Sequence, residues 1–213
     1  QRKNVMYQEV IPESTLNLID KISPHISGFY LAGRTGLALQ LGHRISGDLD
    51  FFNDKNFSPE EINAGIAPDK VVSIRPHTLH CIKDSVRLWF LFYEVPLCYP
   101  MCQWRGLNVA AWQDIVAEKI KTLSQRGSKK DFWDVYSVIS SCSTTQEVSA
   151  LFLERFKDSG INLYHVLKTL VYFEDAENDP DPLIIDKGEV PSWNRIKGFF
   201  IDNIKEFEEV LLS

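Results

Sequence analysis

The chain has 213 residues, of which 44% are hydrophobic and 24% charged, a balance typical of a folded globular protein and not of a disordered one. No apolar run approaches the ~20 residues that cross a bilayer, and the N-terminal segment has no secretory apolar stretch, so we expect a cytoplasmic protein without a membrane partner. The formal net charge of −6 gives no overall attraction to nucleic acid, so any such contact must be local.

The first half of the chain predicts a mixed sheet with flanking helices. Apolar spacing indicates a helix over 13–26, and Gly42 can end a short leucine-rich helix that follows Gly33. Ser58, followed by proline and two glutamates, is typical of a capped helix start. β-rich segments lie at 29–32, 48–52, 71–75, 77–83 and 86–94, and Asp84-Ser85 can form a turn between the last two.

From residue 111 onward the pattern is helical. One apolar stripe runs from Ile115 to Leu123 and another from Phe132 to Ile139. Two more helices are predicted at 146–157 and 163–175, and a terminal amphipathic helix begins at Ser192. The segment 174–191 is polar and predicts a loop. We therefore expect an α+β protein with a mixed β-sheet lobe flanked by helices, 1–108, and a helical C-terminal lobe, 109–213.

Four cysteines, Cys81, Cys98, Cys102 and Cys142, form no Cys-x-x-Cys pair, and a chain of this length does not need disulfides, so we expect reduced thiols. His77 and His80 lie close to the first of them. Their spacing matches no familiar zinc motif, which favours a structural role over a zinc site.

Asp48 and Asp50 are separated by one residue, so on an extended strand both carboxylates point to one face. The turn at Gly33-Arg34-Thr35 joins the preceding strand to a helix, where backbone N–H groups can hold a phosphate. Magnesium bound by one or two carboxylates completes its shell with water and substrate phosphate. The order strand, glycine turn, helix and acidic pair therefore predicts a metal-dependent phosphate site.

Two features of the second half also suggest an anionic ligand. Lys119 lies on or beside an apolar helical stripe, where its ammonium needs a partner such as an anion; a lysine reaching out from the edge of the core is the equally weighted alternative. The segment 126–134 crowds cations at a helix start that Ser128 can cap, although the helix dipole favours anions there. A bound phosphate would relieve that conflict, while Asp131 and Asp134 share one helical face.

The blocks LAGRTGLALQLGHRISGDLDFF and DIVAEKIKTLSQRGSKKDFWDVYSVI together resemble the AbiEii/AbiGii toxin family of the nucleotidyltransferase superfamily, which has the DNA polymerase beta-like fold. The resemblance covers roughly residues 25–140. It implies a magnesium-dependent enzyme, with a two-metal site, that transfers a nucleoside monophosphate from a nucleoside triphosphate to the hydroxyl of an RNA, such as transfer RNA, or of a protein. It also implies a cognate antitoxin protein as partner.

The resemblance assigns roles to particular residues. It implies that Asp48 and Asp50 are catalytic metal ligands, and that Lys119 and Asp131 are catalytic residues of the helical lobe. The residues implied to bind nucleotide are Gly33, Arg34, Thr35, Arg44, Ser46, Lys119 and Lys130.

Two positions depart from the family pattern. Arg34 stands where a second glycine is usual, and its side chain would either block a phosphate or point away from it and add a charge. Trp89 stands where a third carboxylate would be sought, and Glu94 is the nearest acidic residue downstream. The alternative hypothesis is a catalytically impaired protein of the same fold that binds a nucleotide or a partner. A phosphohydrolase using the same acidic pair is more remote.

Overall fold

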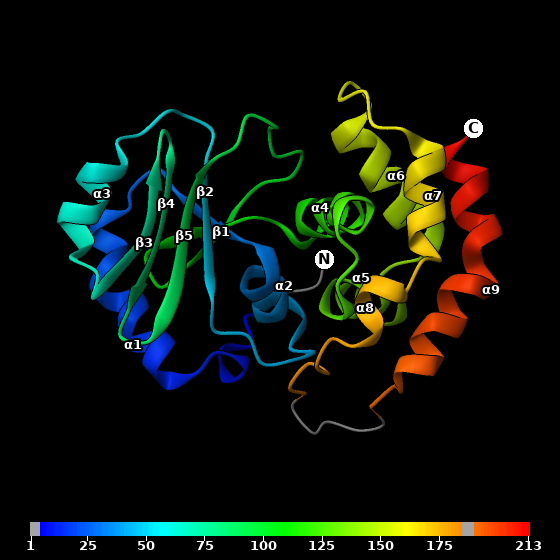
Figure 1. Ribbon diagram of the computed structural model, residues 1–213, viewed down its shortest axis with the longest axis horizontal. Coiled ribbons are helices and arrows are strands. Elements are labelled where there is room, and N and C mark those ends of the chain that lie inside the picture. The colour runs from blue at the N-terminus through cyan, green and yellow to red at the C-terminus, as the bar shows by residue number, and fades with distance from the viewer. Residues whose placement is uncertain (1–4, 185–189) are drawn as a thin grey trace. The chain divides into compact units, whose positions relative to one another are not determined.

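The computed structural model describes residues 5–184 and 190–213, and the chain divides into two compact units, Gln1–Trp112 and Gln113–Ser213. Figure 1 labels the helices and most of the strands. The mixed α/β architecture confirms the expected fold class. Within the described residues, no helix is long and apolar enough to span a membrane.

The first unit is built on one mixed sheet, in the strand order β3-β4-β5-β2-β1-β7-β6. Its strands are β1 (Tyr30–Ala32), β2 (Leu49–Asn53), β3 (Lys70–Arg75), β4 (Thr78–Lys83), β5 (Val86–Phe92), β6 (Cys102–Trp104) and β7 (Leu107–Val109). β2 pairs antiparallel with β1 and parallel with β5, while β1 pairs parallel with β7. β2 is therefore a central strand whose two neighbours come from distant parts of the chain.

The predicted helices of the first half are confirmed. They are α1 (Glu13–Ile22), α2 (Gly33–Leu41) and α3 (Pro59–Ile66), together with 3-10 turns at Gln8–Val10 and Ser23–His25. Pro24 lies in the second 3-10 turn, because it cannot continue an α-helix. Gly42 ends α2 in the left-handed region at φ 68°, and the Ser58 hydroxyl accepts from the Glu61 N–H at 3.2 Å at the start of α3.

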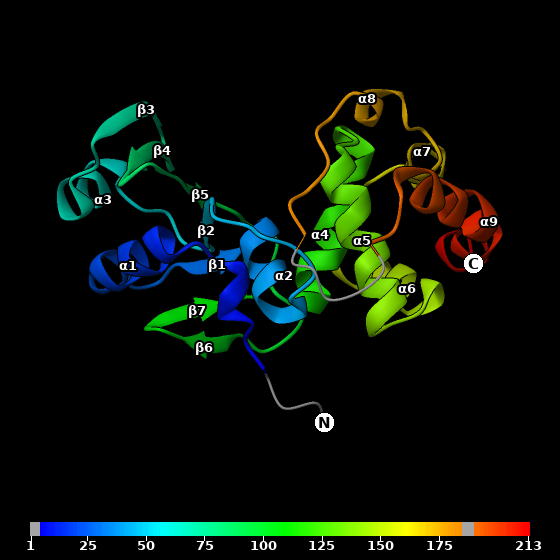
Figure 2. The ribbon, with the colours of Figure 1, turned by 90° about the horizontal axis from the view of Figure 1, so that it is seen from below.

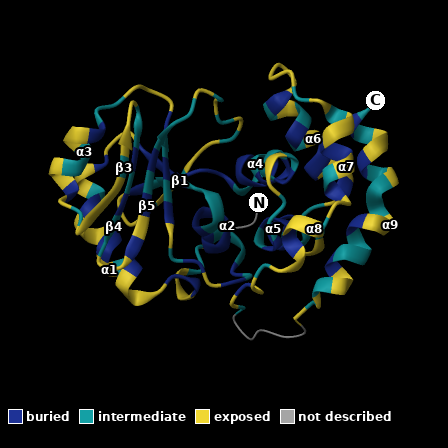
Figure 3. Ribbon diagram, viewed as in Figure 1, coloured by how far each residue is buried: buried dark blue, intermediate teal, exposed yellow. Residues whose placement is uncertain are grey.

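The two faces of the sheet differ in burial, as Figure 3 shows along β2 and β5. Leu49 and Phe51 are fully buried, whereas Asp50 between them is half-buried. On β5, Leu88 and Phe90 are buried in the same alternation. Because side chains alternate along a strand, the acidic residue and its cross-strand neighbours lie on the more open face.

The β6–β7 hairpin was not predicted from the sequence. Its strands have three residues each and are joined by a turn at Arg105 and Gly106, both at positive φ. Figure 2 shows the two strands side by side. Three-residue strands carry too little alternation to stand out in a sequence.

The second unit is helical. Its elements are α4 (Trp112–Gln125), α5 (Lys129–Ser141), α6 (Thr145–Phe156), α7 (Leu163–Leu170), α8 (Glu174–Glu177) and α9 (Trp193–Leu211). Its core is aromatic: Phe132, Phe152, Phe200 and Phe207 are fully buried. The prediction of a loop over 174–191 was wrong for the four residues of α8, and residues 185–189 of that prediction lie outside the described residues.

Candidate functional site

The acidic pair, Asp48 and Asp50, is placed by the junction of β1, α2 and β2. Ala32 at the end of β1 is directly opposite Asp50, and α2 begins at the next residue, Gly33. Gly33 has a φ of +60°, and a Cβ atom there would lie 3.0 Å from the Asp50 Cγ and closer still to a carboxylate oxygen. Glycine is thus required twice, for the left-handed backbone and for the approach of the carboxylate to the helix start.

Asp48 lies just before β2 and is exposed. The buried Thr35 hydroxyl donates to the Asp48 carbonyl oxygen and shares a hydrogen bond of 2.8 Å with the Ser46 hydroxyl. Two residues predicted to bind nucleotide therefore fasten the strand that carries the acidic pair to α2. This explains why the sequence needs small hydroxyl side chains at both positions.

Arg34 and Arg44, also predicted to bind nucleotide, differ in environment. Arg34 is the second residue of α2 and is half-buried. Arg44 is 2% exposed, and its Nη1 donates to the Ile45 carbonyl at 3.4 Å. Arg44 is thus enclosed by the first unit, whereas Arg34 lies at the start of the helix that the acidic pair faces.

The cross-strand neighbours of Asp50 on β5 and β4 are aromatic residues. Trp89 on β5 is directly opposite Asp50, and His80 on β4 is directly opposite Trp89. The two rings stack with centroids 3.6 Å apart and planes inclined by 11°. We call these two residues the aromatic stack. Trp89 therefore occupies the position beside Asp50 where a third carboxylate was sought, and Glu94 lies beyond the end of β5 at Phe92.

In the second unit, Lys119 of α4 is the centre of a buried ion cluster. Its Nζ lies 2.7 Å from Asp131 Oδ1 and 2.9 Å from Asp134 Oδ2, both on α5. The exposed fractions of these side chains are 7%, 1% and 0%. Lys119, Asp131 and Asp134 form what we call the lysine cluster. Lys119 is thus neither at the edge of the core nor without a counterion, since two carboxylates one helical turn apart neutralise it.

The charge state of Asp131 reflects opposing effects. Burial and the Asp134 charge raise the pKa of Asp131, but the Lys119 ammonium and hydrogen bonds from Lys119 and Ser128 hold it below its ordinary value. The Ser128 hydroxyl donates to Asp131 Oδ2 at 2.5 Å. Asp131 therefore stays ionised inside the helical unit.

The start of α5 corrects one prediction. Ser128 occupies the N-cap position, but its side chain makes no capping hydrogen bond; the Asp179 carboxylate accepts from the Lys129 N–H at 3.0 Å instead. Lys129 Nζ in turn lies 3.1 Å from Asp181. The anions that the helix dipole favours at this end are supplied by the chain itself, so a bound phosphate is not needed to explain the cations. Lys130, the predicted nucleotide-binding residue, is half-buried beside them.

The predicted site residues thus form two sets, each within its own unit. Gly33, Thr35, Ser46 and the acidic pair gather in the first, and Lys119, Lys130 and Asp131 lie on neighbouring helices in the second. No role was predicted for Asp134, although its spacing of three residues from Asp131 was a usable signal.

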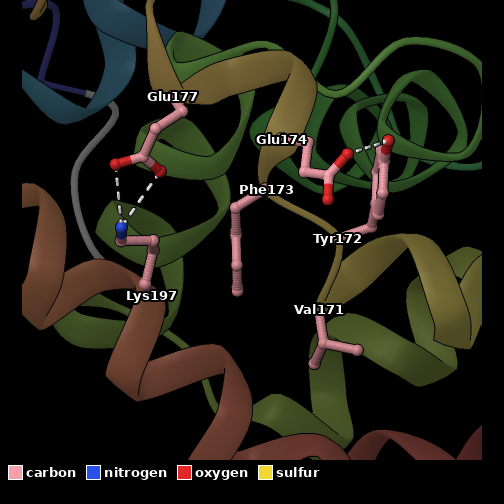
Figure 4. A pocket seen from close by; sticks show the side chains of 6 residues that line it. All are labelled: Val171, Tyr172, Phe173, Glu174, Glu177 and Lys197. Atoms are coloured by element: carbon pink, nitrogen blue, oxygen red, sulfur yellow. Dashed lines mark hydrogen bonds and ion pairs between the residues drawn. The ribbon is translucent and has the colours of Figure 1, made fainter.

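A separate hollow of about 410 Å³ lies in the second unit (Figure 4). It is lined by Val171, Tyr172, Phe173, Glu174, Glu177 and Lys197. Lys197 Nζ lies 3.0 Å from both Glu177 oxygens, and the Tyr172 hydroxyl donates to Glu174 at 3.0 Å. Its charged groups all have partners within the lining, and none of its residues was singled out in the sequence.

The acidic pair suits magnesium in the kind of atoms it offers. Carboxylates are hard oxygen ligands, which Mg²⁺ prefers. Among residues 5–184 and 190–213, no group of three or more His, Cys, Asp or Glu side chains could hold a metal ion. A cation at the pair would therefore take its remaining oxygens from substrate phosphate and water, as magnesium sites in phosphate enzymes do.

Comparison with known proteins gives a family match. The model of the family described as "Nucleotidyl transferase AbiEii toxin, Type IV TA system" matches residues 100–211. This range contains the lysine cluster and continues to the end of α9. The uncharacterized protein aq_aa25 of Aquifex aeolicus (strain VF5) is 31% identical over 191 residues, which cover 85% of this chain and 88% of the relative.

Solved structures share the fold at low identity. MenT4, a nucleotidyltransferase toxin from Mycobacterium tuberculosis H37Rv, matches with a TM-score of 0.58 and 18% identity, over 93% of this chain and 91% of that one. JHP933 from Helicobacter pylori matches with a TM-score of 0.51 and 17% identity, over 93% of this chain and 95% of that one. At these identities the likeness concerns the fold alone.

Proposed function

Because this chain belongs to the AbiEii nucleotidyltransferase toxin family, we propose that it transfers a nucleoside monophosphate from a nucleoside triphosphate to an acceptor hydroxyl. One observation carries the proposal: Asp50 packs against Gly33 at the start of α2, and Asp48 lies two residues earlier, just before β2. The helix start therefore has the acidic pair beside it. That place suits a phosphate held with a divalent cation.

The reaction requires one bond to form and one to break. The acceptor oxygen attacks the α-phosphorus, the bond from that phosphorus to the bridging oxygen breaks, pyrophosphate leaves, and the acceptor proton passes to solvent. Asp48 and Asp50 would hold one or two Mg²⁺ ions, which supply charge neutralisation for the phosphates and activation of the acceptor oxygen. The first N–H groups of α2 have no partners within the helix, so they can bind phosphate oxygens beside the Asp50 carboxylate, which packs against Gly33.

Thr35 and Ser46 support this site without touching substrate. The Thr35 hydroxyl donates to the Asp48 carbonyl and is itself hydrogen-bonded to the Ser46 hydroxyl, which fixes the path of the chain into β2. The roles that the family resemblance implies for Lys119, Lys130 and Asp131 stay predictions. Transfer RNA is the acceptor that we would test first, with a protein acceptor second, and we propose a cytoplasmic protein with a cognate antitoxin.

A second function is favoured by one observation. Trp89 lies in register beside Asp50, in the place of a third carboxylate, so the pair has fewer acidic neighbours than a full metal site would use. A protein that binds a nucleotide and magnesium without turning it over is the alternative.

The deciding experiment measures label transfer. The protein is incubated with Mg²⁺, each of the four α-labelled nucleoside triphosphates, and total transfer RNA or cell extract, next to the variants Asp48→Asn and Asp50→Asn. Asp54→Asn is the matched control, because Asp54 is exposed just beyond the end of β2. We expect labelled product from the native chain and the control, and a loss of at least ~100-fold in the two variants, since metal-held charge contributes several kcal/mol.

The outcomes separate the two functions. No product from the native chain with any nucleotide rejects the catalytic proposal. Magnesium-dependent nucleotide binding that persists in that case, and is weakened by Asp50→Asn, supports the non-catalytic alternative. The variant Arg34→Gly then tests whether Arg34 causes the loss of activity, because transfer would be restored in this variant.

A further inference from the structure

Basic residues share one face of the sheet with Asp50. Lys70 on β3 is directly opposite Ile82 on β4, which is directly opposite Arg87 on β5. Residues directly opposite in neighbouring strands have their side chains on the same face. Arg87 lies two residues before Trp89, the cross-strand neighbour of Asp50, so alternation along β5 places both on one face. Lys70 and Arg87 therefore belong to the face that carries Asp50.

Arg75, the last residue of β3, lies on this face as well. It is directly opposite Thr78 on β4, and Thr78 is directly opposite Leu91 on β5. Leu91 in turn is directly opposite Phe52, two residues after Asp50 on β2. The same alternation therefore brings a third cation to the face of Asp50. We call these three residues the open-face cations: Lys70, Arg75 and Arg87.

The open-face cations are exposed, and the chain does not neutralise them. Among residues 5–184 and 190–213, their side chains form no ion pair or hydrogen bond. The carboxylates at the nearby strand ends are engaged elsewhere: Asp84 pairs with Lys21 at 2.8 Å, and Asp69 accepts from the Asp84 N–H at 2.7 Å. The charge of the open-face cations is therefore available to an anion from outside the chain.

Protection of a sheet edge explains only part of this charge. Basic residues are common on edge strands, where they discourage pairing with another chain, and β3 is an edge of this sheet. Arg87, however, lies on β5 between β4 and β2, where there is no edge to protect. Burial lowers the pKa of His80 most, the Arg87 charge lowers it further, and the charges of the acidic pair oppose both. Arg87 and the acidic pair thus act on the same imidazole and lie near each other.

We propose that the open-face cations bind backbone phosphates of an RNA acceptor whose reacting end lies at the acidic pair. The inference rests on the proposed function, in which an acceptor hydroxyl reacts beside Asp48 and Asp50. The chain has a net charge of −6, so local cations must hold a polyanion such as RNA.

The spacing of the open-face cations suits a polymer. Adjacent strands are ~4.8 Å apart and residues rise ~3.3 Å along a strand, so the Lys70 backbone lies on the order of 10 Å from that of Arg87. By the same geometry it lies roughly 16 Å from that of Arg75. Charges spread over such distances suit separate phosphates of a polynucleotide better than one small anion. Contacts of this kind position an RNA without reading its sequence.

The experiment measures RNA affinity as a function of salt. Fluorescence anisotropy with end-labelled total transfer RNA gives dissociation constants at several salt concentrations and constant Mg²⁺, without nucleotide. The variants are Lys70→Gln, Arg75→Gln and Arg87→Gln, singly and together, and Arg87→Lys retains the charge. Lys205→Gln is the matched control, because Lys205 on α9 is also exposed and forms no ion pair within the part of the chain that the structure describes. Label-transfer assays on the same proteins give KM for the RNA and for the nucleoside triphosphate.

The expected result is a smaller salt dependence in the open-face variants. Each phosphate contact contributes about 0.7–0.9 to the slope of log affinity against log salt concentration. Each glutamine variant should therefore reduce the slope by that amount, and the triple variant by about 2–3. Arg87→Lys and Lys205→Gln should keep the native slope. In the triple variant KM for the RNA should rise, whereas KM for the nucleoside triphosphate should not.

Several outcomes would overturn the inference while the proposed function stands. One is a native slope in the triple variant, or an equal loss of slope in Lys205→Gln, because neither result gives this face a special role. Another is a rise in KM for the nucleoside triphosphate alone, which assigns the cations to that substrate. Label transfer to a protein of the cell extract and not to RNA is the third.

Failure of the proposed function gives a different result. If the native chain transfers no label, the proposed function fails, and the salt slopes still decide whether this face binds RNA. Circular dichroism shows whether each variant is folded. The single variants carry the comparison if the triple variant is not.

Discussion

Replacing Lys119 with methionine should destabilise the protein strongly, because it leaves two buried carboxylates facing each other. In the native chain the ammonium lies within 2.9 Å of both Asp131 and Asp134, whose side chains are 1% and 0% exposed. Methionine fills a similar volume, so the main loss is the charge. Removing one partner of a buried ion pair costs roughly 3–5 kcal/mol, since the remaining charge is uncompensated.

That magnitude is large compared with total stability. Native domains have free energies of unfolding of about 5–15 kcal/mol, so the variant should lose about a fifth or more of it. For a chain of 213 residues the melting temperature should fall by ~6–20 °C. Lys121→Met on the same helix is the control. Lys121 lies 3.7 Å from Glu118 and retains 19% exposure, so its loss should cost under ~1 kcal/mol.

The effect of pH has a definite sign. In the native chain the folded pKa of Asp131 lies below its unfolded value of ~3.9, so its contribution to stability is present above that value and is lost as pH falls through the lower folded one. Without Lys119, burial and the Asp134 charge raise the folded pKa instead. The loss of stability caused by the buried Asp131 charge is complete at pH values far above the raised pKa. It becomes smaller as pH falls toward ~4.

The measurement is urea unfolding of the native, Lys119→Met and Lys121→Met proteins at about pH 7 and about pH 5. The difference between native and Lys119→Met should be largest at the higher pH and narrower at the lower. The lysine cluster as described would be refuted if Lys119→Met lost less than about 1 kcal/mol of unfolding free energy at the higher pH. It would also be refuted if the difference between the native protein and this variant grew on acidification.

Two other predictions follow from single contacts. Gly33→Ala should lower the free energy of unfolding by about 1–2 kcal/mol because of the positive φ at Gly33, and should also weaken magnesium binding by displacing the adjacent Asp50 carboxylate. Gly198→Ala in α9, where a Cβ would have nothing within 4 Å, should instead stabilise the protein by roughly 0.5–1 kcal/mol. Thermal melts with and without Mg²⁺ test both variants, and the same change in stability for both would contradict the close approach of Asp50 to Gly33. A thiol reagent at mildly alkaline pH should modify exposed Cys98 well before Cys81, whose burial raises its pKa to about 11; peptide mapping that finds the reverse order would exclude this burial.

Local signals in the sequence predicted the elements that depend on neighbouring residues. The turn at Asp84-Ser85 is confirmed, with φ of 48° and 66° at the two residues. The capped start of α3 at Ser58 is confirmed as well. Both depend on residues within a few positions of one another, which is the range over which turn and capping chemistry acts.

Signals that depended on distant partners were missed or wrong. Ser128 is a typical helix-capping residue, but the Lys129 N–H at the helix start donates its hydrogen bond to the Asp179 carboxylate, about fifty positions away. The hairpin of β6 and β7 was missed, although β7 becomes a parallel neighbour of β1. Nothing local specifies such pairings, because they are chosen by packing between segments far apart in the chain.

The predictions for the candidate site also divide into those that depend on neighbouring residues and those that depend on distant ones. The sequence by itself predicted that the acidic pair follows a glycine turn, which is a local property; only Asp50 lies within β2, which begins at Leu49, so a shared face of the two carboxylates stays a prediction. Only the tertiary structure decided that Trp89 and His80 continue the row from Asp50, since strand order and register are set by contacts across the sheet. It also decided that Lys119 is neutralised by two aspartates of α5, because a buried charge takes its partner from whichever helix packs beside it.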